Sequence, residues 1–400
     1  MKKLFRFLPL FIAAVMLAWA CEGPMGPAGA DGKDGADGED GADANETCKL
    51  CHNSTVVDAK AIEYEHSLHF AGEAFEEGTR NNCAPCHSHQ GFIDVVKNNT
   101  PATITQNPTD PTKYVNNYVA SASALALPGP ISCFTCHSSL HKNYAATDFF
   151  PLATTAAVPM TMWGGTKTAN FAKTSSNLCA KCHQPRPVTA SSGALIAYDK
   201  LVSEPSAIYN MSSISYRTGV HYGVQAAIAA GTGGIEFGSG YTNSAHVTGA
   251  SCSDCHMATP SGLSGGHSFV ATNNFLGCNT TGCHTSMSGT NASLTAIKTE
   301  ISTKLEELAA KINAIGSGHD ILQKDPEDGL YHGYFDIYDA SSNPTGYWKN
   351  PANGNPAFPA LTNAQFGAII NFQLLVRDAS GGVHNYAYTK KLLENTIAAI

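Results

Sequence analysis

The sequence is poor in charged residues, which make up 14% of its 400 positions, against about 25% in ordinary soluble domains. The balance is also acidic, with a formal net charge of −8. This argues against nucleic-acid binding, because affinity for phosphate groups needs a cationic face. After residue 20 the chain lacks any run of 18 or more apolar residues, which excludes a multi-pass membrane protein.

The N-terminus has the pattern of a signal peptide over residues 1–20. Lys2, Lys3 and Arg6 precede an apolar stretch at 7–17, which is too short for a spanning helix. The junction before Cys21 resembles a bacterial lipoprotein signal, and this resemblance implies lipidation of Cys21 and a lipid anchor in the membrane. The alternative is an ordinary signal peptide that leaves Cys21 as a spare thiol.

Residues 21–46 form a segment of different composition. Glycine occupies every third position from Gly23 to Gly41, as in collagen, where only glycine fits at the axis of the triple helix. The segment predicts either an extended stalk, with a possible homo-oligomer, or a flexible acidic linker.

Cysteine is abundant, and 12 of the 13 cysteines fall into six pairs, each followed directly by histidine. So many thiols predict metal, cofactor or disulfide chemistry. In chain order the motifs, called first to sixth below, are Cys48, Cys51, His52; Cys83, Cys86, His87; Cys133, Cys136, His137; Cys179, Cys182, His183; Cys252, Cys255, His256; and Cys278, Cys283, His284.

The first five motifs have the C-x-x-C-H spacing of c-type haem attachment, and the sixth is a longer variant. Two thioether bonds hold one edge of the porphyrin, and the adjacent imidazole binds the iron. Zinc sites and disulfide scaffolds also use paired cysteines, but neither requires histidine after each pair. The chain therefore resembles the multihaem c-type cytochromes, which implies a hexahaem domain over 47–290 that binds six haems c and their iron.

Ten histidines remain as candidates for the opposite side of each iron. We predict six distal ligands, which are His69, His141, His221, His246, His267 and His384. Surface positions or other hydrogen bonds are expected for His66, His89, His319 and His332. Met160 and Met162 are alternative ligands by type, although packing against a porphyrin is the expected role.

The region 291–400 is expected to be helical and to pack on the haem core or on a second subunit. An apolar stripe predicts a helix over 291–316 with Asn291 as N-cap, and further helices near 362–377 and 388–400. Residues 320–360 are expected to form a loop. The string from Asp378 to Asn385 resembles D-x-S-x-G-x-H-N in nitrite-reductase-related multihaem cytochromes, which implies that His384 is a ligand. The C-x-x-C-K motif that often marks their catalytic haem is absent.

The expected fold is mainly α with extensive irregular coil and a haem-filled core. The expected function is electron transfer at the outer membrane or cell surface, with other redox proteins or extracellular acceptors as partners and no catalytic residue. A periplasmic location is the alternative. The alternative function is a reductase of nitrogen or sulfur oxyanions, which needs one five-coordinate haem and basic residues such as Arg217 or Arg377.

Overall fold

A computed structural model describes residues 53–80, 83–97, 104–106, 114–116, 128–137, 152–188, 196–209 and 214–400. The chain divides into residues 1–57 and 58–400, and the following description concerns the second unit. Cys21, the collagen-like segment, the first motif and His141 lie outside the described residues.

Short helices and turns dominate the first part of this unit. Its helices are α3 (Ser54–Glu65), α4 (Leu68–Ala71), η1 (Ala74–Thr79), α5 (Ala84–His87), α6 (His89–Lys97), α8 (Cys133–Cys136), η3 (Thr161–Trp163), α9 (Ser176–Ala180), α10 (Tyr198–Ser203), α11 (Gln225–Ala229), α12 (His246–Gly249), α13 (Cys252–His256) and η4 (Gly266–Ser268). Most are only one or two turns long, so side chains and loops rather than long helices position the motifs.

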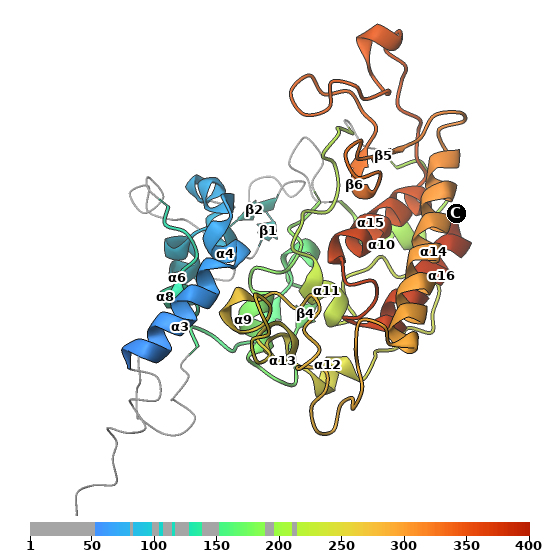
Figure 1. Cartoon of the computed structure of the whole chain (residues 1–400). Coiled ribbons are helices and arrows are strands. Elements are labelled where there is room, and N and C mark those ends of the chain that lie inside the picture. The colour runs from blue at the N-terminus through green and yellow to red at the C-terminus, as the bar shows by residue number, and fades with distance from the viewer. Residues whose placement is uncertain are drawn as a thin grey trace, which may run out of the picture. The chain divides into compact units, whose positions relative to one another are not determined.

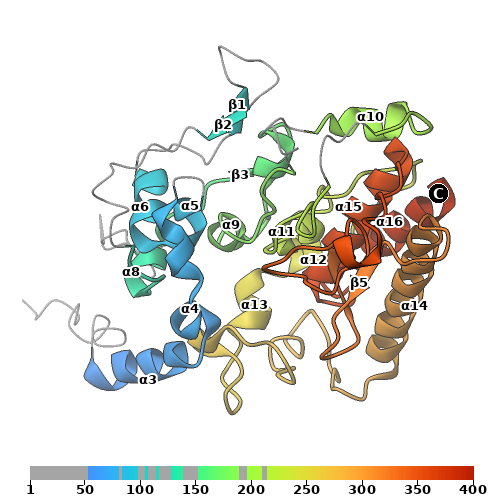
Figure 2. The same cartoon turned by 90° about the horizontal axis from the view of Figure 1, so that it is seen from above.

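Three long helices follow the last motif. They are α14 (Ala292–Ala314), α15 (Asn363–Asp378) and α16 (Tyr386–Ala399), which lie side by side (Figures 1 and 2). The three predicted helices are therefore confirmed, and Asn291 caps α14 by accepting hydrogen bonds from the backbone of Ser293 and Leu294. Among the described residues, no helix is both long and apolar enough to cross a bilayer.

Three small antiparallel sheets complete the described structure. They pair β1 (Ile104–Gln106) with β2 (Tyr114–Asn116), β3 (Val158–Pro159) with β4 (Thr168–Ala169), and β5 (Leu322–Lys324) with β6 (Tyr331–Phe335). In the last pair Leu322 lies opposite Phe335 and Lys324 opposite Tyr331. This hairpin, together with η5 (Pro351–Asn353), interrupts the loop predicted for residues 320–360.

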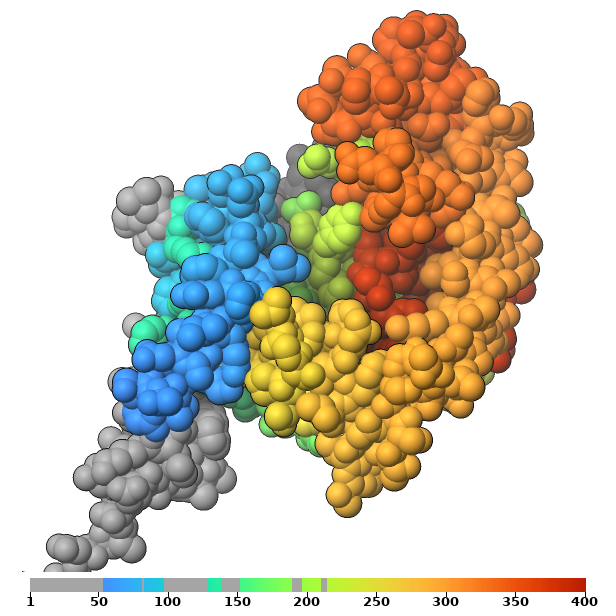
Figure 3. Space-filling model, viewed as in Figure 1, coloured from blue at the N-terminus to red at the C-terminus, as the bar shows by residue number. Residues whose placement is uncertain are grey.

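The largest hydrophobic core surrounds α15, which is buried along nearly its whole length. Ile301, Leu308 and Ile312 of α14 pack into this core, which also contains residues from before position 290, such as Leu201 and Ile228. On the face shown in Figure 3, little of the red C-terminal segment reaches the surface. The protein therefore has a side-chain core of its own, and α14 packs on α15 and α16. The haem-filled core remains a prediction.

Candidate functional site: five pairs of facing histidines

The cysteine motifs form compact turns. In the second, third and fifth motifs a one-turn helix spans the two cysteines, which places both side chains on the same side. Ser132 and Ser251 precede their motifs as N-caps in capping boxes, with Thr135 and Asp254 as the reciprocal partners. The local sequence thus fixes the cysteine spacing.

Each motif histidine in the described residues faces the ring of a second histidine. The five pairs, with the distance between ring centres and the angle between ring planes, are His87 and His221 (6.0 Å, 87°), His137 and His267 (6.4 Å, 41°), His183 and His69 (6.0 Å, 70°), His256 and His384 (6.2 Å, 32°), and His284 and His246 (6.0 Å, 83°). We call them the second-motif to sixth-motif pairs.

These separations match a metal held between two imidazoles. With metal–nitrogen bonds of about 2.0 Å on opposite sides, the two ring centres lie about 6.3 Å apart. The observed range of 6.0–6.4 Å therefore leaves space for one iron in each pair. The donor set, two imidazoles beside two cysteines, also fits a covalently attached haem.

Hydrogen bonds at Nδ1 orient six of these rings. His87, His221, His246 and His256 donate from Nδ1 to the backbone carbonyl oxygens of Ala74, Tyr222, Val383 and Phe269, at 2.7–3.0 Å. His183 Nδ1 lies 3.2 Å from Gln225 Oε1, and His384 Nδ1 lies 2.7 Å from Asp378 Oδ1. Because these acceptors hold the proton on Nδ1, the lone pair of Nε2 is available for a metal.

Burial and neighbouring charge influence the protonation of the paired rings. Burial, with a smaller contribution from His183, lowers the pKa of His69 to about 4, which keeps the ring neutral. Burial is the largest single influence on His384 and lowers its pKa, but the hydrogen bond to Asp378 and the negative charges of Asp378 and Cys252 together outweigh burial, so the pKa of this ring is raised. The fifth-motif pair is thus distinguished by a buried carboxylate on one ring.

Polar side chains from the C-terminal helices hold the loops that carry the distal histidines. Gln373, in the middle of α15, accepts a hydrogen bond from the backbone N–H of Val220 (3.0 Å) and donates to the carbonyls of Thr218 (3.0 Å) and Gly333 (2.8 Å). Gly219 lies against it with φ at +124°, and a Cβ there would come within 1.9 Å of Gln373 Oε1. The helix core therefore fixes the backbone immediately before His221.

A similar contact fixes the sixth-motif pair. Asn385, the N-cap residue of α16, accepts a hydrogen bond from the Ser244 backbone (2.9 Å) and donates to Asn243 Oδ1 (2.8 Å). These contacts bring the loop before His246 beside the loop that carries His384. Because His246 Nδ1 donates to the Val383 carbonyl, two pairs share one short stretch of backbone.

The pairs are connected to one another through their motifs. Cys86 Sγ donates to Lys181 O (3.7 Å) and Cys182 Sγ donates to Pro85 O (3.8 Å), which links the second and fourth motifs. The backbone N–H of Cys252 donates to Ser176 Oγ (3.1 Å), and α13 packs against α9, which links the fifth and fourth motifs. The second-, fourth-, fifth- and sixth-motif pairs therefore follow one another as a line of neighbours.

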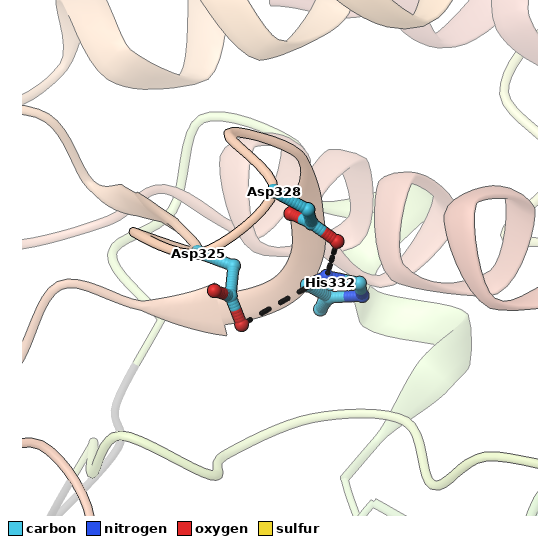
Figure 4. A group of neighbouring side chains, drawn as sticks. All are labelled: Asp325, Asp328 and His332. Carbon is cyan, nitrogen blue, oxygen red and sulfur yellow. Dashed lines mark hydrogen bonds and ion pairs between the residues drawn. The ribbon is translucent and has the colours of Figure 1, made fainter.

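The other uses of paired cysteines find no support in the described residues. Apart from Cys83, the nine other described motif cysteines form no disulfide bond. Within the same residues, the only group of three or more His, Cys, Asp or Glu ligand atoms within 4.8 Å of one another is Asp325, Asp328 and His332 (Figure 4). His332 Nε2 lies 2.9 Å from Asp328 there, in the β5–β6 turn and away from the motifs.

Five of the six predicted distal histidines are thus brought opposite a motif histidine, and the sixth, His141, lies outside the described residues. The four histidines predicted to have other roles have other surroundings. His66 is exposed, His89 Nδ1 contacts Thr135 Oγ1 (2.8 Å), His319 stacks on Tyr347 and His332 contacts Asp328. Met160 and Met162 are fully buried among protein side chains.

The two basic residues considered for an oxyanion site differ in their surroundings. Arg217 is exposed. Arg377 is buried, stacks over the rings of Tyr222 and Tyr334 (4.6 and 5.2 Å) and donates to the carbonyls of residues 332 and 333.

Sequence reasoning missed the residues that orient the ligands. Phe269 and Gln225 contact ligand rings, and Glu63 accepts a hydrogen bond from the His267 backbone (2.9 Å). None of these residues belongs to a motif, and each lies far along the chain from at least one ring that it contacts. Asp378 had a signal, because it stands in the string that ends with His384 and Asn385.

Comparison with known proteins gives one kind of match. Over 392 aligned residues the chain is 26% identical to proteins described as C-type polyheme cytochrome OmcB from two strains of Geobacter sulfurreducens. The alignment covers 86% of this chain but only 46% of those relatives, so the chain spans less than half their length. No protein-family model and no solved structure matches. This weak homology supports a multihaem c-type cytochrome with an electron-transfer role.

Proposed function

We propose that this protein is a hexahaem c-type cytochrome that relays electrons and has no substrate site at its irons. The observation that carries the proposal is the facing histidine across from every described motif histidine. An iron with an imidazole on each side has no open position for a substrate. It can still change oxidation state, which is the property that an electron relay needs.

The chain's own residues have distinct roles in this proposal. The cysteine pairs would attach the haems covalently. The motif histidines and their partners would hold the irons, and in the described residues these partners are His221, His267, His69, His384 and His246. The Nδ1 acceptors hold each ring in the required tautomer and orientation. A haem supplies one-electron oxidation and reduction, and two imidazole ligands without methionine favour low potentials.

The count of six rests on the motifs. Five pairs lie in the described residues, whereas His52 of the first motif and His141 lie outside them. His141 remains the predicted distal ligand of one haem. If one iron were five-coordinate, as the alternative oxyanion reductase requires, the first motif would be its place.

The proposed location is outside the cytoplasm, on a membrane anchor. The signal-peptide pattern at 1–20, the lipidation pattern at Cys21 and the collagen-like segment support an exported lipoprotein at the outer membrane or cell surface. A periplasmic protein is the alternative. Other redox proteins or extracellular acceptors are the proposed partners, and the low positive charge of the chain gives no reason to expect nucleic acid.

Electron paramagnetic resonance of the fully oxidised protein, with haem content measured as the pyridine haemochrome, tests the proposal. The expected result is six haems per chain, with all ferric iron in low-spin signals. A high-spin signal equivalent to one haem in the native protein would favour the reductase. His384→Ala is a positive control, because loss of one distal ligand should create such a signal. Protein that matures in a cytochrome-assembling host without covalent haem would refute the proposal.

A further inference from the structure

Phe269 contacts three of the five histidine pairs. Its ring packs edge-on against His69 of the fourth-motif pair (5.0 Å between ring centres) and against His267 of the third-motif pair (6.0 Å). Its carbonyl oxygen accepts the Nδ1 hydrogen bond of His256 in the fifth-motif pair, at 2.8 Å. No haem motif includes this residue, and its position follows only from the fold.

The backbone at Phe269 adopts a conformation that is unfavourable for its side chain. Its φ of 58° and ψ of 11° are left-handed, a region that glycine and asparagine occupy more easily than an aromatic residue. The surrounding turn holds it there, since Gly265 N–H bonds the Val270 carbonyl and Gly266 N–H bonds the Ala258 carbonyl, both at 2.8 Å. The left-handed turn points the ring at two ligands and the carbonyl at a third, and a strained residue at such a place is characteristic of a functional constraint.

Phe269 connects the third-motif pair to the other described pairs. The second-, fourth-, fifth- and sixth-motif pairs form a line through the contacts of Cys86 with Lys181, Cys252 with Ser176, and His246 with Val383. Phe269 contacts His267 of the third-motif pair and also the fourth- and fifth-motif pairs, which are the two middle pairs of this line.

We propose that Phe269 is a positioning residue that joins three haem sites and makes the relay branched. This inference rests on the proposed function, because it requires haems at these pairs. Phe269 fixes the ring orientation of His69 and His267 by packing and that of His256 by its carbonyl. Among the five described pairs, the third-motif site is then a side branch.

The test replaces Phe269 with Asn, which accepts the left-handed backbone but removes the ring. Phe358→Asn is the matched control, because Phe358 packs on Phe335 and Trp348 and contacts no histidine pair. Haem content is measured first, followed by low-spin ferric resonance and a potentiometric titration read by that resonance. If Phe269→Asn does not mature, Phe269→Leu, which keeps an apolar side chain without a ring, replaces it.

The angle between the ring planes allows the signals of the pairs to be told apart. The third- and fifth-motif pairs have ring planes inclined at 41° and 32°, whereas the untouched second- and sixth-motif pairs are nearly perpendicular, at 87° and 83°. Because the Asn variant keeps the backbone carbonyl but removes the ring, it should shift the signals and midpoint potentials of the third- and fourth-motif pairs, whose His267 and His69 the ring contacts. It should leave those of the second- and sixth-motif pairs in place. The Phe358 variant should match the native protein.

Three outcomes would count against the inference, and they are distinguishable. Signals and potentials of the third- and fourth-motif pairs that stay unchanged in a fully loaded Phe269 variant would overturn the branch alone. Native protein without low-spin haems would overturn the proposed function and the branch with it. Equal changes in all five pairs would also refute the branch, because they would indicate a general loss of structure.

Discussion

Replacing Asp378 with Asn should raise the reduction potential of the haem that His256 and His384 hold. Asp378 is buried, and its Oδ1 accepts the Nδ1 hydrogen bond of His384 at 2.7 Å. Ser380 Oγ donates to the other carboxylate oxygen. Asn has the same shape and can still accept from His384 and pair with Ser380, so the substitution removes the charge and keeps the contacts.

The size of the effect follows from Coulomb's law. Through the hydrogen bond and the ring, the carboxylate lies about 7 Å from a metal bound at Nε2 with a bond of about 2.0 Å. At an effective dielectric constant of about 20, a unit charge at that distance contributes about 2.4 kcal/mol, equivalent to about 100 mV for one electron. The negative charge favours the ferric state, so its removal makes reduction easier and raises the potential.

The assay is a potentiometric titration followed by optical absorbance, on native and variant protein. One haem's share of the absorbance change should move to a potential higher by about 50–100 mV, while the rest of the curve stays in place. Glu307→Gln, on the exposed face of α14, is the control for loss of one carboxylate elsewhere. A variant curve that coincides with that of the control would refute the reasoning. Asp378→Glu, which keeps the charge, should show a smaller change than Asp378→Asn.

Three further predictions concern the ring angles and the loop before His221. The second-, fourth- and sixth-motif pairs have ring planes at 70–87° to each other, and the third- and fifth-motif pairs at 41° and 32°. Because the angle between the imidazole planes sets the splitting of the iron d orbitals, these two sets should give two groups of low-spin ferric signals. A single group in the resonance spectrum would contradict the angles. Gln373→Ala removes the partners of the buried Val220 N–H and the Thr218 carbonyl, whereas the Gly333 carbonyl keeps its hydrogen bond from Arg377. The variant should lower the free energy of unfolding in a denaturant titration by about 2–4 kcal/mol, whereas the exposed Glu307→Gln should not. Gly219→Ala places a Cβ on Gln373 at a positive φ, so it should displace His221 and produce a high-spin ferric signal that the native protein lacks.

The sequence was informative where chemistry imposes a local spacing. The helix at α14 followed from an apolar stripe and the cap at Asn291, and the cysteine motifs from their fixed intervals. The hairpin of β5 and β6 was missed because its strands are short and its turn, at residues 325–330, has the composition of a loop.

Local sequence patterns could not show which histidines face each other in the fold. Neighbouring strings indicated which histidines to consider, but the match of His183 with His69, or of His256 with His384, depends on contacts between distant segments. Gln373, on a buried helix, holds the backbone before His221. Phe269, in a left-handed turn, contacts His69 and His256. Neither position carries a pattern that distinguishes it from an ordinary core or loop residue.

The distances along the chain between paired histidines constrain how the protein matures. His256 belongs to a motif in the middle of the sequence, whereas its partner His384 lies near the end, and the Val383 carbonyl beside that partner also orients His246. A chain truncated before residue 383 would lack His384 and the Val383 carbonyl, so the fifth-motif pair would lose one member and the sixth-motif pair would lose the acceptor that orients His246. Under the proposed function, the site of His256 can therefore be completed only after the C-terminal segment has docked.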